Sequence, residues 1–154
     1  FKRIGCVYYV KYDEDEPALQ LIQDGIAYPN GITLSPDGQF IYVAEFNTNS
    51  LVCIPSAAYT LGRATPCVFA RMDGGHGPDG ITVDADGNLY VAHLEAKEVL
   101  VFDRDGFQIE RISAPEDADI FVDNLCIHDG YLYICEFGSS NIYRIAVTAE
   151  TGEK

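Results

Sequence analysis

Short apolar runs separated by polar turns extend along the whole chain. In QFIYVAEF, residues 39–46, both the odd and the even positions are largely apolar, which is the pattern of a strand covered on both faces. Helical periodicity is nearly absent. The stretch EPALQLIQD, residues 16–24, could form a short helix, but the β-branched and aromatic runs around it favour a strand. The pattern therefore predicts an all-β protein with about thirteen strands.

Three stretches repeat the same order of predicted elements. They are YPNGITLSPDGQFIYVAEF (28–46), GGHGPDGITVDADGNLYVAH (74–93) and, more loosely, VDNLCIHDGYLYICEF (122–137). Each contains a strand, an Asp-Gly turn and a second strand, and the turn residues Asp37, Asp86 and Asp129 lie 49 and 43 residues apart. A third strand follows in each unit and a fourth in two of them. This period lies in the range of propeller blades.

The repeat predicts a β-propeller of four-stranded antiparallel blades. We expect residues 1–27 to supply the last two strands of one blade, 28–72 and 73–115 to form two blades, and 116–150 to form a last, incomplete blade within a domain of residues 1–154. These amount to about three blades, whereas closed propellers have typically four to eight. The missing Met and the start in mid-blade favour the C-terminal part of a six-bladed protein. The alternative is a second copy that closes the ring.

Composition excludes several partners. The chain has 24 acidic and 10 basic residues among 154, a formal charge of −14, which would repel a nucleic-acid backbone and suits a protein that gathers cations. No apolar run approaches the ~20 residues that span a membrane. The five cysteines, at positions 6, 53, 67, 126 and 135, form no C-x-x-C pair, so neither a disulfide framework nor a structural zinc site is predicted. A reducing compartment, the cytoplasm, is the expected location.

Asn30 and Asp79 occupy the same register of their repeats. Each directly precedes a Gly and lies seven residues before the Asp of the turn. Because the first strand of every blade lines the central tunnel, both side chains should converge on the axis. The third unit is one residue shorter and offers Asp123, next to Asn124, at the corresponding place. Amide and carboxylate oxygens together favour a hard cation such as Ca²⁺.

A purely structural interpretation of these residues also exists. Pro-Asn-Gly and Pro-Asp-Gly are ordinary turn tripeptides whose side chains often bond the local backbone. Two occurrences in register, each followed by a matched strand, favour function.

The segments PNGITLSPDGQFIYVAE and GPDGITVDADGNLYVA, followed by EVLVFDRDG, resemble the senescence-marker-protein/gluconolactonase family over about residues 5–147. These are six-bladed propellers that include sugar lactonases and the related diisopropyl fluorophosphatase. The resemblance implies that Asn30 and Asp79 ligate one divalent metal at the tunnel mouth, with Ca²⁺ preferred and Zn²⁺ or Mn²⁺ as alternatives. The family's other two ligands, a Glu and an Asn from earlier blades, match nothing in this sequence.

The chemistry that the resemblance implies is metal-assisted opening of a small lactone, a gluconolactonase-like hydrolase activity. Asp79 is the candidate catalytic residue, as general base or nucleophile, besides being a metal ligand. His76, Asp123 and Asn124 are candidate pocket residues.

Two further interpretations remain open. A propeller can serve as a non-catalytic binding or scaffold module, because one fold hosts unrelated functions. Within the enzyme class, the same metal could polarise a phosphoryl oxygen, as in a phosphotriesterase.

Overall fold

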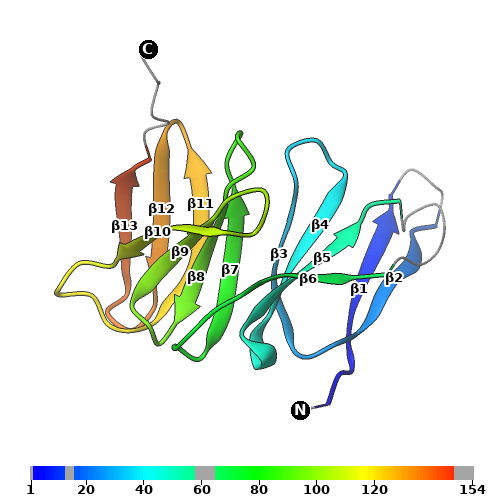
Figure 1. Cartoon of the computed structure of the whole chain (residues 1–154), viewed down its shortest axis with the longest axis horizontal. Coiled ribbons are helices and arrows are strands. Elements are labelled where there is room, and N and C mark those ends of the chain that lie inside the picture. The colour runs from blue at the N-terminus through cyan, green and yellow to red at the C-terminus, as the bar shows by residue number, and fades with distance from the viewer. Residues whose placement is uncertain (1, 13–15, 58–64, 148–154) are drawn as a thin grey trace.

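The computed structural model describes residues 2–12, 16–57 and 65–147. These residues form thirteen strands and one short 3-10 helix, arranged as four antiparallel sheets that lie side by side (Figure 1). None of the described residues belongs to a helix long and apolar enough to cross a membrane.

Each sheet is built from strands that follow one another in the chain. The first sheet contains β1 (Gly5–Lys11) and β2 (Ala18–Ile26). The second contains β3 (Pro29–Leu34), β4 (Phe40–Glu45), β5 (Ser50–Pro55) and β6 (Cys67–Arg71), with the 3-10 helix η1 (Phe46–Thr48) between β4 and β5. The third contains β7 (Gly77–Val83), β8 (Leu89–Leu94), β9 (Glu98–Phe102) and β10 (Gln108–Ser113). The fourth contains β11 (Val122–His128), β12 (Tyr131–Glu136) and β13 (Asn141–Ala146).

The predicted fold class is confirmed. The second and third sheets are four-stranded antiparallel blades with their strands in chain order, and the ambiguous stretch at 16–24 lies largely in β2, which pairs antiparallel with β1. The four sheets together form a partial β-propeller. Of the predicted blade boundaries, those at residues 1, 150 and 154 lie outside the described residues.

Three hydrophobic layers hold the four sheets together. One lies between the first and second sheets around Ile22 and Ile54, the next between the second and third around Leu51 and Leu100, and the last between the third and fourth around Leu132. Strands β4, β5, β8 and β9 are therefore buried along nearly their whole length. This burial explains why their sequences are apolar at both odd and even positions.

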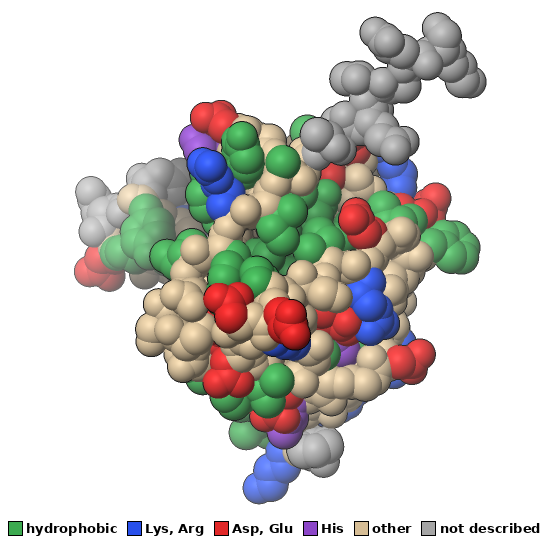
Figure 2. All heavy atoms as spheres, turned by 90° about the vertical axis from the view of Figure 1, so that its left-hand side faces the viewer, with side chains coloured by type: hydrophobic (Ala, Val, Ile, Leu, Met, Phe, Trp, Pro, Cys, Tyr) green, Lys and Arg blue, Asp and Glu red, His purple; other side chains and the backbone are tan. Residues whose placement is uncertain are grey.

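The two outermost sheets each leave one face exposed. On the first sheet Leu19 is 70% exposed, and on the fourth Ile142 is 73% exposed and lies opposite the exposed Cys135. Figure 2 views the molecule from the side where β13 lies and shows hydrophobic side chains among acidic ones. A partial propeller exposes such faces, because in a closed ring each blade covers the next.

The first strands of the last three sheets, β3, β7 and β11, lie next to one another and run in the same direction (Figure 1). They approach so closely that a side chain does not fit between them at two positions. A Cβ added to Gly31 would lie 2.7 Å from the backbone nitrogen of Ile81, and one added to Gly80 would lie 2.7 Å from the carbonyl oxygen of Asp123. Glycine therefore allows the residues that precede it, Asn30 and Asp79, to come together.

Candidate functional site

The same irregularity occurs near the start of β3, β7 and β11. The pairing of each with the second strand of its sheet shifts register once, at residues 30–31, 79–80 and 123. Such β-bulges redirect side chains and are frequent beside active sites. The three bulges therefore contain Asn30, Asp79 and Asp123.

Strand pairing shows that these three residues are structurally equivalent. The last paired residues before each bulge are Pro29 with Glu45, Pro78 with His93, and Val122 with Glu136. Asn30, Asp79 and Asp123 follow directly, and the next positions hold Gly31, Gly80 and Asn124. Asp123, rather than Asn124, thus corresponds to the other two candidate residues.

Asn30 and Asp79 lie in contact across the boundary between β3 and β7. Burial raises the pKa of Asp79 to about 6, the negative charge of Asp123 acts in the same direction, and a hydrogen bond with the side chain of Asn30 acts in the opposite direction. Because a carboxylate only accepts hydrogen bonds, the Asn30 amide is the donor. The structure thus brings an amide and two carboxylates from three sheets close enough to influence one another's charge.

Asp123 contributes an unsatisfied oxygen to this group of three side chains. Its Oδ1 is buried and has no hydrogen-bond partner among the described residues. A buried polar atom without a partner needs a physical explanation, for example an ion or a water molecule. The neighbouring Asn124 differs, because its Oδ1 accepts a 2.8 Å hydrogen bond from the backbone N–H of Leu125.

His76 lies in the loop before β7, with its side chain 59% exposed. Its Nδ1 is 2.8 Å from Oε2 of Glu95, and its ring stacks on that of Phe46 with 5.7 Å between centroids. These contacts place His76 at the same end of the inner strands as the bulges. Its polar partner is Glu95.

Aromatic side chains at this end of the inner strands escaped the sequence analysis. The rings of Tyr28 and Phe46 lie 5.4 Å apart, and those of Phe121 and Phe137 stack at 4.8 Å. Tyr28 and Phe121 lie two residues before Asn30 and Asp123, while Phe46 and Phe137 follow the polar residue that ends the second strand. The repeated letters AEF and CEF in the sequence were the signal that could have identified the latter pair.

The donor set suits a hard cation. Among the described residues no group of three or more His, Cys, Asp or Glu is placed to hold a metal, and the candidate site contains two carboxylates and one amide. All three offer oxygen atoms, which Ca²⁺ prefers. The raised pKa of Asp79 is expected where a partly buried acid faces a second acid, and the unpartnered Oδ1 of Asp123 adds one more oxygen to the donor set.

Comparison with known proteins agrees with this architecture. The chain is 37% identical over 114 residues to lactonase drp35 of Staphylococcus epidermidis, an alignment that covers 73% of this chain and 34% of the relative. The chain thus spans about a third of the length of the curated relatives that it matches.

Solved structures with a similar fold include related proteins. A calcium-binding protein, regucalcin, from Agrobacterium tumefaciens is 27% identical with a TM-score of 0.69, covering 88% of this chain and 45% of that one. A gluconolactonase from Xanthomonas campestris is 28% identical with a TM-score of 0.65, covering 77% of this chain and 37% of that one.

The sequence model of the SMP-30/gluconolactonase/LRE-like region matches residues 2–135, which is most of the chain. Relatives named lactonases, propeller neighbours and three equivalent inner-strand residues all agree with this match. The chain therefore belongs to the SMP-30/gluconolactonase/LRE-like family.

Proposed function

We propose that this chain supplies part of the active site of a metal-dependent hydrolase that opens a small lactone, as a gluconolactonase does. The observation that supports the proposal most strongly is the equivalence of Asn30, Asp79 and Asp123 at one bulge position in three adjacent inner strands. The relatives named lactonases support the same reaction class.

In this proposal Asn30 and Asp79 hold one divalent cation, and Asp123 provides a further oxygen through its unpartnered Oδ1. Ca²⁺ fits this oxygen set best, with Zn²⁺ or Mn²⁺ as alternatives. When bound, such a cation polarises the lactone carbonyl and stabilises the negative charge that develops on its oxygen. Ca²⁺ takes six to eight oxygen ligands. Water, substrate and other parts of a complete propeller would supply the remainder.

The residues of this chain perform the proton chemistry. Asp79 accepts a proton from the attacking water while the new C–O bond forms, and it returns that proton to the ring oxygen as the ester C–O bond breaks. Burial and the negative charge of Asp123 favour the protonated form of Asp79, whereas a bound cation would oppose it. The Asn30 amide orients the Asp79 carboxylate, and the negative charge of Asp123 keeps that carboxylate basic.

The exposed faces of the first and fourth sheets support a larger assembly. Either N-terminal blades or a second copy of the chain would cover Leu19 and Ile142 and close the ring. We place the protein in a reducing compartment such as the cytoplasm, because its five cysteines are odd in number and form no C-x-x-C pair.

The test uses the complete polypeptide that carries this chain. Calorimetry with Ca²⁺, Zn²⁺ and Mn²⁺ measures metal binding, and pH-stat titration with glucono-1,5-lactone measures hydrolysis before and after EDTA. We expect a chelator-sensitive activity that Asp79→Asn reduces by about 100-fold or more, as for loss of a group that acts in the transition state. The matched control is Asp129→Asn, in a turn of the fourth sheet, where the side chain is 83% exposed.

Two outcomes would contradict the proposal. A protein that ignores all three cations and hydrolyses nothing would be a binding or scaffold propeller. A protein that binds metal but cleaves a phosphotriester such as paraoxon in preference to lactones would be a phosphotriesterase-like hydrolase.

A further inference from the structure

Three buried polar residues lie at or next to the ends of the second strands of the last three sheets. Glu45, His93 and Glu136 are 2%, 0% and 1% exposed, and each pairs with the residue directly before a candidate site residue. All three occupy the same position of the sequence repeat. Their contacts show that each also reaches the segment that leads into the inner strand of its own sheet, called here the inbound segment: residues 27–29, 73–78 and 119–122.

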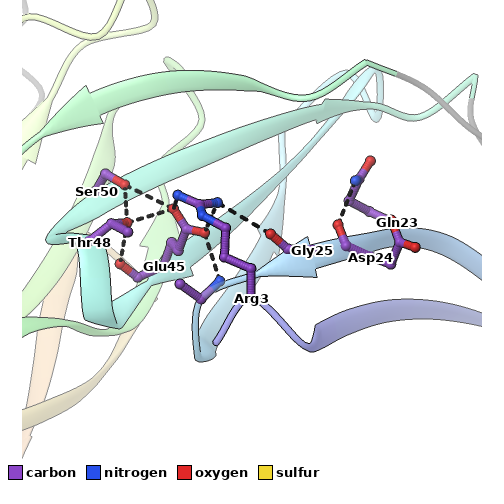
Figure 3. Close-up of polar contacts among 8 residues, drawn as sticks. Arg3, Gln23, Asp24, Gly25, Glu45, Thr48 and Ser50 are labelled. Atoms are coloured by element: carbon purple, nitrogen blue, oxygen red, sulfur yellow. Dashed lines mark hydrogen bonds and ion pairs between the residues drawn. The ribbon is translucent and has the colours of Figure 1, made fainter. Parts of the chain in front are cut away.

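Glu45 has the densest set of contacts, shown in Figure 3. Its Oε1 accepts hydrogen bonds from the backbone N–H of Ala27 at 2.7 Å and from Nη1 of Arg3 at 2.8 Å. Its Oε2 accepts hydrogen bonds from the hydroxyls of Thr48 at 2.6 Å and Ser50 at 3.4 Å. Four donors on one buried carboxylate fix its orientation, because charge-assisted hydrogen bonds are short and strong.

The bond to Ala27 connects Glu45 to the site. Ala27 begins the inbound segment and lies three residues before Asn30. The backbone N–H of Phe46 also donates to the carbonyl of Tyr28 at 3.0 Å, so two successive residues of this segment are tied to the end of β4. Glu45 therefore holds in place the segment that directly precedes Asn30.

Glu136 makes the corresponding contacts in the fourth sheet. It accepts hydrogen bonds from the backbone N–H groups of Ser139 at 3.1 Å and of Asp119 at 3.4 Å, and from the Ser139 hydroxyl. Burial pushes the pKa of Glu136 up, but the bonds from Ser139, Gly138 and Asp119 more than offset this, so its pKa lies below the usual value. Asp119 begins the inbound segment that leads to Asp123.

His93 supports the inbound segment of the third sheet in two ways: its ring packs against the segment, and it bonds to Asn49, which in turn bonds to the segment. Its Nδ1 is 3.2 Å from Oε1 of Glu98 and its Nε2 is 3.2 Å from Oδ1 of Asn49. Asn49 in turn donates to the carbonyl of Gly74 at 2.7 Å. A Cβ added to Gly75 would lie 2.7 Å from Cε1 of His93, so the segment before Asp79 passes directly against the imidazole ring.

We propose that Glu45, His93 and Glu136 are positioning residues, which hold the three inbound segments and thereby set the directions of Asn30, Asp79 and Asp123. The functional meaning of this inference rests on the proposed metal site, since those three residues are its oxygen donors. The alternative is that the three buried residues only stabilise the turns between second and third strands. In all three sheets a buried glutamate or histidine at the same position contacts the inbound segment. This repetition favours a positioning role.

Glu45 offers the sharpest test, because its link to Asn30 is a single backbone hydrogen bond. In metal-free protein, ¹⁵N-resolved NMR follows the side-chain amide of Asn30, assigned from its loss in Asn30→Asp, and the exchange rates of the backbone amides of residues 27, 28, 30 and 31. We expect Glu45→Ala to shift the Asn30 side-chain signals and to accelerate exchange in this segment at least tenfold. Glu45→Gln keeps an acceptor oxygen for Ala27 and should stay within about threefold of the parent.

The control is Leu100→Ala, a truncation in the core between the second and third sheets. It lowers stability without touching residues 27–31 and should leave the Asn30 signals in place. An unchanged Asn30 side chain in folded Glu45→Ala, or an equal change in Leu100→Ala, would overturn the proposal. If Glu45→Ala does not fold, Glu45→Asp replaces it, because its carboxylate is one methylene too short to reach Ala27.

The readout needs neither metal nor substrate. A protein that binds none of Ca²⁺, Zn²⁺ and Mn²⁺ would refute the proposed function alone, whereas an Asn30 side chain that does not respond to the Glu45 substitution would refute positioning alone.

Discussion

Asp79→Asn should stabilise the fold while it removes function. The folded-state pKa of Asp79 is about 6, against an ordinary 3.8, chiefly because the carboxyl is partly buried and also because it faces Asp123. A raised pKa means that the folded state binds a proton more tightly than the unfolded state. This group's contribution to stability is therefore fully present below about pH 4 and is lost as the pH rises through about 6. Asn mimics the neutral form at every pH.

The magnitude follows from that difference. At about 1.4 kcal/mol per pKa unit, the full shift corresponds to about 3 kcal/mol. Because water screens a partly exposed group, we expect about 1–2 kcal/mol of stabilisation in the variant at pH 8. For a chain of this length, that corresponds to a rise in Tm of about 3–6 °C. The gain should shrink steadily toward pH 4.

Urea unfolding followed by circular dichroism, at half-unit steps from pH 4 to pH 8 in the presence of EDTA, measures this effect. Asp129→Asn is the control and should change the free energy of unfolding by less than about 0.5 kcal/mol at any pH, as is usual for an exposed position. A gain for Asp79→Asn that is independent of pH, or a loss of stability at pH 8, would show that Asp79 is not held in the environment that the structure describes.

Two further predictions concern the packing that forms the site. Gly80→Ala should destabilise the fold by about 1–3 kcal/mol, because the new methyl group would lie 2.7 Å from both Cα of Asn124 and the carbonyl oxygen of Asp123; an unchanged urea midpoint would mean that β7 and β11 can separate freely. Leu51→Ala, at a side chain with 0% exposure, should cost about 2–5 kcal/mol. The same truncation at Leu34, which is 48% exposed, should cost less than about 1 kcal/mol, and equal losses would contradict the assignment of the core between the sheets.

The comparison of sequence and structure is clearest at the inner strands. The register of Asn30 and Asp79 could be predicted because both precede a Gly at a fixed distance from an Asp-Gly turn, and repeat position is a property of the chain alone. The shorter third repeat left Asp123 and Asn124 as joint candidates. Strand pairing resolves which of them corresponds to Asp79, because the bulge in β11 contains Asp123.

By itself, the sequence determined the fold class, the four-stranded antiparallel blades and the family resemblance. Alternation, turn chemistry and repeat spacing are short-range features, so they can be recognised without coordinates. Only the tertiary structure decided that the Asn30 amide contacts the Asp79 carboxylate, that Oδ1 of Asp123 is left without a partner, and that Glu45 reaches Ala27. The physical reason is that burial and side-chain direction at a bulge depend on strands from different sheets, and these meet only when the blades pack together.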